Sequence, residues 1–202
     1  MKTLQEAWDW YQCTKTNLER MWRLGRRHWN TDALQGTSIR SDERFKHLEA
    51  DEILQGSSKA LEPIDDLAVL VLFSVFESAV REHLERTVKP LAAKLNGTVL
   101  EYAADLALDG IRQGSFANQV LEPLKTQGRI ASELCEEVNQ VRKYRNWVAH
   151  GKRGSGDKVD NVTARLAFER LKECLDVLGI AVEAKLDSSA HLSEERYGDS
   201  AD

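Results

Sequence analysis

Residues 65–88 read DDLAVLVLFSVFESAVREHLERTV and form the most hydrophobic stretch of this 202-residue chain. At its centre, residues 67–76 are apolar apart from one serine, and acidic residues lie on both sides. A helix that spans a bilayer needs about 20 apolar residues, so this stretch is too short and too charged at its ends to cross a membrane. We expect it to be the core helix of the fold, beginning at Asp65 or Asp66 and ending before Pro90.

The other segments also predict helices, because apolar residues recur at helical spacing and no segment shows sustained alternation of apolar and polar residues. With 42% hydrophobic residues, 30% charged residues and three prolines, the composition is typical of a helical protein. The fold class is therefore predicted to be all-α. The expected helices cover residues 4–25, 41–54, 65–88, 98–111 and 129–150, and a last one begins at Asp160 or Asn161 and reaches Val182.

Three parts follow from this pattern. Residues 1–62 are expected to form an N-terminal helix and a polar connecting segment packed on a helical core at residues 63–186. Residues 187–202 hold five acidic residues against one arginine and almost no apolar residues, so a disordered acidic tail is predicted. The tail accounts for most of the net charge of −5, so positive charge in the core is local rather than general.

The cysteines and the known catalytic motifs exclude several classes of protein. Cys13, Cys135 and Cys174 are odd in number and far apart in sequence, which predicts a reduced, cytoplasmic chain without structural zinc. The chain opens without an apolar leader, and no membrane association is expected. The glycines of residues 151–158 lack P-loop spacing, and HExxH and GxSxG motifs are absent. We expect neither a metal nor another cofactor.

The basic segment RKYRNWVAHGKR at residues 142–153 carries the clearest chemical signal. It holds five fixed positive charges, no carboxylate and a single histidine just before a glycine. Histidine has an unperturbed pKa near ~6.5 and can transfer protons around neutrality. An arginine beside it can stabilise negative charge on a phosphate. The spacing of interest is Arg145-Asn146, three further residues, and then His150.

This spacing resembles the Arg-x4–6-His motif of the HEPN superfamily, whose members are small all-helical domains, many of them metal-independent ribonucleases that work as dimers. The resemblance covers roughly residues 65–186 and implies a HEPN-like up-down bundle with an extra N-terminal helix. It also implies an RNA endonuclease in which the 2′-hydroxyl attacks the adjacent phosphate. His150 would act as general base or acid and Arg145 would neutralise the phosphorane.

Such enzymes commonly serve as toxins or defence effectors, so an antitoxin or another regulatory protein is a further expected partner. HEPN toxins paired with nucleotidyltransferase antitoxins typically carry a tyrosine two residues after the histidine. Here that position is Lys152, which puts regulation by adenylylation there in doubt. Many family members have lost catalysis, so the alternative is a non-catalytic HEPN-like module that binds RNA or a protein.

Arg145 is expected on the apolar face of its helix, where a lone charge is too costly to remain unpaired. Glu77 falls on the apolar face of the core helix and is the predicted partner. It resembles a glutamate that approaches the motif in several HEPN families, so we include Glu77 in the site. The pair can equally be structural and fix how the two helices dock.

His150 would face about 140° away from Arg145 in an unbroken helix. Gly151 predicts that the helix ends there, so His150 can turn toward Arg145 or toward the same motif in a second subunit of a homodimer. It can also be a helix-terminal histidine favoured by the helix dipole. Asn146 is expected to orient His150 or to hold a phosphate.

The remaining basic residues are candidate RNA contacts. Arg142, Lys143, Lys152 and Arg153 surround the motif. A second basic and aromatic patch at residues 20–29 adds Arg26, Arg27 and Trp29, since interleaved arginine and tryptophan can bind single strands by stacking and phosphate contacts. Trp147 is expected to pack on the core or on a partner subunit, and Tyr144 to stack or to cover the surface.

Overall fold

A computed structural model describes residues 1–31, 37, 42–152 and 161–183. Every regular element among these residues is a helix, which confirms the all-α prediction. The elements in chain order are α1 (Leu4–Arg27), α3 (Ala50–Leu61), α4 (Ile64–Ala93), α5 (Glu101–Gln113), the π-helix η1 (Phe116–Leu121), α6 (Glu122–Thr126), α7 (Ser132–Ala149) and α8 (Ala164–Val177).

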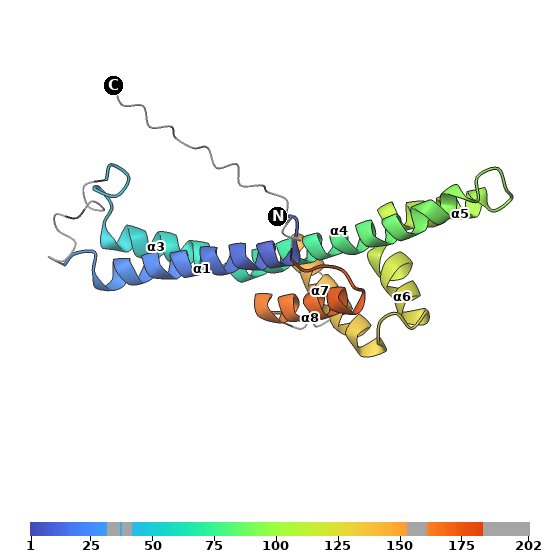
Figure 1. Ribbon diagram of the computed structural model, residues 1–202. Coiled ribbons are helices and arrows are strands. Elements are labelled where there is room, and N and C mark those ends of the chain that lie inside the picture. The colour runs from blue at the N-terminus through green and yellow to red at the C-terminus, as the bar shows by residue number, and fades with distance from the viewer. Residues whose placement is uncertain (32–36, 38–41, 153–160, 184–202) are drawn as a thin grey trace, which may run out of the picture.

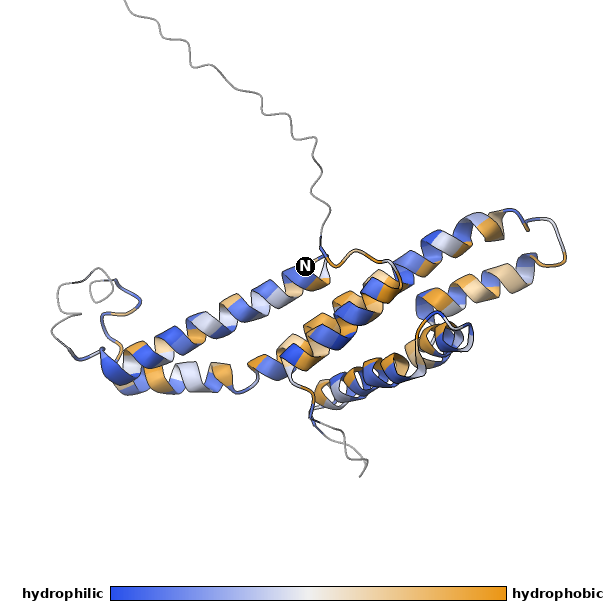
Figure 2. Ribbon diagram, turned by 60° about the horizontal axis from the view of Figure 1, so that its bottom comes forward, coloured by the Kyte–Doolittle hydropathy of each residue, from blue (hydrophilic) through white to orange (hydrophobic). Residues whose placement is uncertain are grey.

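The long helix α4 is the axis of the molecule, and it contacts α1, α3, α5, α7 and α8. Its 30 residues span about 45 Å. The pair of α1 and α3 extends beyond one end of α4, α5 folds back along the other end, and α7 and α8 pack against its middle (Figure 1). Hydrophobic residues gather along the middle of α4, whereas α1 is largely hydrophilic (Figure 2).

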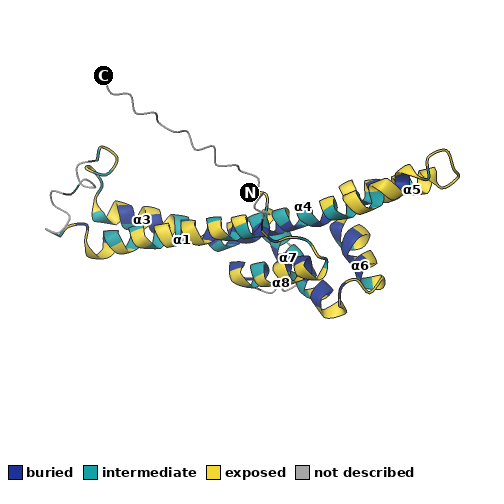
Figure 3. Cartoon of the chain, in the orientation of Figure 1, coloured by how far each residue is buried: buried dark blue, intermediate teal, exposed yellow. Residues whose placement is uncertain are grey.

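The core lies where α4, α7 and α8 meet, because each of these helices contributes its apolar stripe there. Phe73, Phe76 and Phe116 form a cluster with ring centroids 5.7–5.8 Å apart, in the tilted and edge-to-face arrangements that aromatic quadrupoles favour. Val138 of α7 and Leu171 of α8 are completely buried against this cluster. Buried residues follow the contact faces of these helices, and exposed residues cover the outer face of α1 and the turn between α4 and α5 (Figure 3).

Several predicted boundaries are wrong. The core helix continues through Pro90 to Ala93, since the neighbouring residues are exposed and water can hydrate the carbonyl that the proline leaves without a donor. The helix expected at residues 41–54 instead begins at Ala50, where Glu49 and Glu52 form a capping box.

The last helix also differs at both ends. Its N-cap is Thr163, whose Oγ1 accepts from the backbone N–H of Leu166 at 3.2 Å, rather than Asn161. Asp160, the other predicted cap, lies outside the described residues, as does the predicted acidic tail. The helix ends at Val177, and Gly179 (φ 68°) turns the chain so that Val182 is buried outside any helix.

We expect Gly114→Ala to destabilise the fold by about 1–3 kcal/mol. A Cβ atom at Gly114 would lie 2.5 Å from the carbonyl oxygen of Gly110, and that backbone atom cannot move aside. Gly56 in α3 has open space around it, so Gly56→Ala should stabilise by up to about 1 kcal/mol through helix propensity. Urea unfolding of both variants measures the difference, and equal midpoints would contradict the close approach.

Candidate functional site

The basic segment forms the C-terminal half of α7, which is helical because its apolar residues recur every three or four positions. Leu134, Val138, Val141 and Tyr144 are buried on this stripe. His150 is the C-cap, with φ −89° and ψ 20°, and Gly151 follows at φ 68°. The prediction that the helix ends in a left-handed glycine after the histidine is therefore confirmed.

Arg145 lies half-buried at the edge of this stripe. Its guanidinium carbon is 5.8 Å from the centre of the Phe73 ring of α4, within cation–π distance. Its Nη1 donates to Oδ1 of Asn146 at 3.0 Å, and its Nε is buried without a hydrogen-bond partner. In the part of the chain that the structure describes, no carboxylate forms an ion pair with Arg145. Its positive charge is thus held in place but not neutralised.

The predicted pair of Glu77 with Arg145 is wrong. Glu77 instead pairs with Arg81, one turn further along α4, with its Oε1 2.6 Å from Nη2. Residues four apart on a helix already lie side by side, so the closer cation forms the ion pair. Arg81 also donates to the carbonyl oxygen of Gly114 at 2.9 Å and lies over the Phe116 ring. Glu77 therefore fixes the segment between α5 and η1 to α4.

His150 is exposed. Its backbone N–H donates to the carbonyl oxygen of Asn146 at 3.0 Å. Across the described ranges, its imidazole makes no hydrogen bond or ion pair, and so none with Arg145 or Asn146. Asn146 holds Arg145 rather than His150, which is a role that the sequence did not predict. Within one chain, neither Arg145 nor His150 is neutralised by a carboxylate among the described residues, and no hydrogen bond joins the two side chains.

Lys152, a predicted RNA contact, is already paired. Its Nζ lies 2.7 Å from Oδ2 of Asp66 and 5.6 Å from the centre of the Trp147 ring. Its backbone has φ 58°, a left-handed conformation that costs a non-glycine residue about 1–3 kcal/mol. The ion pair and the ring contact hold this conformation. Trp147 packs on the core, which confirms the prediction for it.

Tyr144 does not cover the surface, because it is buried and its hydroxyl donates to Oδ1 of Asp66 at 2.6 Å. Burial and this hydrogen bond raise the pKa of Tyr144 to about 12. Burial acts to raise the pKa of Asp66, but hydrogen bonds from Lys152 and Tyr144 outweigh it and hold that pKa below its ordinary value. Asp66 thus fixes Tyr144, in the C-terminal part of α7, and Lys152, two residues beyond its cap, to the first turn of α4.

Sequence reasoning missed Asp66, although a signal was present. Two adjacent aspartates precede the most apolar helix, and the structure uses both of them. Asp65 accepts hydrogen bonds from the hydroxyl of Tyr11 at 2.7 Å and from Nζ of Lys15 at 2.9 Å, which ties α1 to α4. Each aspartate is therefore bound by one tyrosine and one lysine.

The other predicted RNA contacts are dispersed. Arg142 is half-buried with its Nε 2.8 Å from Oδ1 of Asn139, and Lys143 is exposed. Arg153 lies outside the described residues. Arg26 and Arg27 are exposed at the far end of α1, about 18 Å along the helix from Lys15.

Trp29 is not available for stacking on a base, so that prediction is wrong. Its ring is 1% exposed, and its indole N–H donates to the carbonyl oxygen of Leu48 at 2.8 Å. A tryptophan that follows two arginines fits a nucleic-acid surface by composition, but this one closes the end of the α1–α3 pair. The structure therefore does not join the patch at residues 20–29 to the motif on α7.

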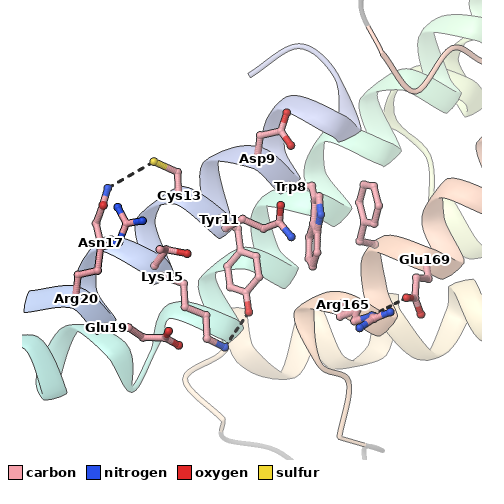
Figure 4. A pocket seen from close by; sticks show the side chains of 13 residues that line it. Trp8, Asp9, Tyr11, Cys13, Lys15, Asn17, Glu19, Arg20, Arg165 and Glu169 are labelled. Atoms are coloured by element: carbon pink, nitrogen blue, oxygen red, sulfur yellow. Dashed lines mark hydrogen bonds and ion pairs between the residues drawn. The ribbon is translucent and has the colours of Figure 1, made fainter. Parts of the chain in front are cut away.

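A large groove runs between α1 and α8, with a volume of about 1110 Å³, and no motif residue lines it. Trp8 of α1 stacks on Phe168 of α8 there, with ring centroids 4.7 Å apart. Figure 4 shows Cys13, Asn17 and Arg20 along the α1 side and Arg165 with Glu169 on the α8 side.

Neither a metal site nor a membrane segment is found in the described ranges. No group of three or more His, Cys, Asp or Glu residues lies close enough there to hold a metal ion. No described helix is both long and apolar enough to span a bilayer.

Comparisons of the chain with protein-family models, with curated proteins and with solved structures found no match.

We expect Tyr144→Phe to lower the free energy of unfolding by about 1.5–3 kcal/mol at pH 7, because it removes a hydrogen bond to a charged carboxylate. Asp66 has a lowered pKa in the folded chain, so its contribution is present above the unfolded pKa and is lost as pH falls through the folded one. The difference between wild type and variant should therefore shrink below about pH 4. Unfolding curves from pH 3 to 7 measure this.

Tyr102 supplies the matched control, since its side chain is 78% exposed. Tyr102→Phe should change stability by less than about 0.5 kcal/mol at every pH. A Tyr144→Phe effect that stays constant down to pH 3 would show that Asp66 is not the acceptor that matters.

Proposed function

We propose that this chain is a metal-independent RNA endonuclease of the HEPN type that acts in the cytoplasm as a homodimer. The observation that carries the proposal is that the guanidinium of Arg145 is fixed in position but not neutralised. A half-buried guanidinium fixed over Phe73, with no carboxylate partner among the described residues, is suited to binding an anion. An exposed histidine follows five residues later, at the end of the same helix.

The reaction divides between these two residues. The 2′-oxygen of the RNA forms a bond to the adjacent phosphorus while the bond from phosphorus to the 5′-oxygen breaks. His150 accepts the proton of the 2′-hydroxyl or donates a proton to the leaving 5′-oxygen, the roles of a general base or acid. Arg145 stabilises the charge that develops on the phosphorane, and because its position is already fixed it needs little reorganisation.

The geometry supports a site built from two chains. Arg145 extends over α4 toward Phe73, whereas His150 lies beyond the end of α7, and no hydrogen bond joins them in one chain. In a homodimer, the His150 of one subunit can lie beside the Arg145 of the other. Asn146 positions Arg145, while Lys143, Arg142 and Arg153 would contact the RNA backbone. Glu77 has no part in this site, since it holds Arg81.

One observation favours the alternative of a non-catalytic module that binds RNA or a regulatory protein such as an antitoxin. Lys152 is held by Asp66, so the basic segment offers fewer free charges than its sequence indicates. RNA binding that is sensitive to salt, without any cleavage, would support this second function. A role as a toxin or defence effector belongs to the first function and needs cleavage.

We expect His150→Ala to reduce RNA cleavage by about 10²–10⁴-fold while leaving the unfolding midpoint unchanged, since loss of a general acid or base has this effect. His28 gives a matched control, because it is also exposed and is also the C-cap of a helix. His28→Ala should cleave like the wild type in the same assay of mixed RNA. Full activity in folded His150→Ala would remove the assignment.

Cleavage should survive EDTA and should yield a 2′,3′-cyclic phosphate and a 5′-hydroxyl, because the nucleophile belongs to the substrate. DNA and RNA with a 2′-methoxy group at the scissile position should bind without being cut. Mass spectrometry of the cleavage products identifies the cyclic phosphate and the 5′-hydroxyl. Lys143→Ala should reduce the slope of log affinity against log salt by about one. A requirement for magnesium, or equal cutting of DNA, would contradict the mechanism.

A further inference from the structure

The outward face of α1 carries charge in an ordered pattern. An exposed stripe with helical spacing runs along it and consists of Glu6, Asp9, Gln12, Cys13, Thr16, Asn17, Arg20 and Arg23. Both acids lie in the N-terminal half of this stripe and both bases in the C-terminal half. Within the described ranges, none of the four forms an ion pair. Glu6 and Asp9 accept only from the backbone N–H of Lys2 and from the amide of Gln5.

A stripe that is acidic at one end and basic at the other is complementary to its own copy when the two run antiparallel. With the two-fold axis between Thr14 and Lys15, Asp9 of one chain faces Arg20 of the other, and Glu6 faces Arg23. Gln12 then faces Asn17 between them. The favourable pairs end there, because the next pair outward, Lys2 with Arg27, has like charge.

The middle of the stripe permits close approach, since the residues nearest the axis are the small Cys13 and Thr16. The groove between α1 and α8 is lined on the α1 side from Trp8 to Arg20, and this stretch is centred on the same axis. Its volume of about 1110 Å³ corresponds to about two to three turns of a helix with a diameter of about 10 Å. The Asp9–Arg20 stretch is about three turns long.

We propose that α1 is the dimerisation surface of this protein, and that the α1 stripe of a second copy lies antiparallel in the groove between α1 and α8. The inference shares with the proposed function only the existence of a homodimer. Tyr11 and Lys15 line this groove and bind Asp65, next to the aspartate that holds Lys152, so the dimer surface lies beside the residues that fix the motif.

Charge exchange tests the pairing. Arg20→Glu replaces two attractive pairs with repulsive ones by symmetry and should raise the dimer dissociation constant by about tenfold or more in sedimentation experiments. Asp9→Arg should do the same, and Asp9→Arg combined with Arg20→Asp should restore the wild-type value to within about threefold. Arg129→Glu reverses an exposed charge outside α1 and should leave dimerisation unchanged.

Cross-linking tests the register. Cys13 is the exposed cysteine, whereas Cys135 and Cys174 are buried, so a disulfide between chains reports on position 13. The double variant Cys13→Ser/Thr16→Cys has its exposed thiol opposite the Cys13 of a wild-type partner. An oxidised mixture of this variant with wild type should form linked dimers faster than either protein alone, because a disulfide needs Cα atoms less than about 7 Å apart.

A strict monomer at about 100 μM would overturn the proposal, since a dimer with a dissociation constant of even about 1 mM would be partly populated at that concentration. A dimer that Arg20→Glu leaves intact, or that the charge exchange fails to restore, would also overturn it. The proposal would also be overturned if either protein alone formed disulfide-linked dimers faster than the mixture. These measurements do not depend on RNA cleavage, so a failed cleavage assay and a failed dimerisation assay remain distinguishable.

Discussion

The arrangement of helices depends on two adjacent aspartates in the first turn of α4. Asp65 binds Tyr11 and Lys15 of α1, and Asp66 binds Tyr144 of α7 and Lys152 beyond it. Both carboxylates also lie in the first turn of α4, at the positive end of the helix dipole, where negative charge stabilises a helix. Hydrogen bonds to charged groups contribute more than neutral ones, so this one turn orients two other helices at once.

The same interaction explains why the end of the motif helix has a defined shape. A left-handed lysine after a left-handed glycine is strained, and without a partner the chain at Lys152 would relax to other conformations. Asp66 holds the ammonium group and Trp147 covers it, so the backbone at Gly151 and Lys152 is fixed. The position of the exposed histidine is therefore set by contacts on either side of it rather than by its own side chain.

The helical class and the apolar stripes of α4 and α7 could be predicted from the sequence, because periodicity reports which face of a helix is buried. The ion-pair and hydrogen-bond partners of individual side chains could not be predicted in the same way. Glu77 and Arg145 were expected to pair because each lies on an apolar face, yet Arg81 was one turn from Glu77 on the same helix. The contacts of the two aspartates join residues 54 and 78 positions apart, and no local pattern carries that information. Trp29 was misjudged because an amphipathic ring fits a surface and a core equally well by composition.

The continuity of α4 has a mechanical consequence. Val80 is the last buried residue that α4 contributes to the core, and from there the helix continues about 20 Å to Ala93 without a break and in contact with α5, so this end behaves as a stiff arm held at the core. A tilt of about 5° at Val80 would displace the far end by about 1.7 Å. The far end carries Val99, Leu100 and Tyr102, all exposed by more than half. A small rearrangement of the core around Val80 would therefore appear as a larger movement at a tip that lies outside the core.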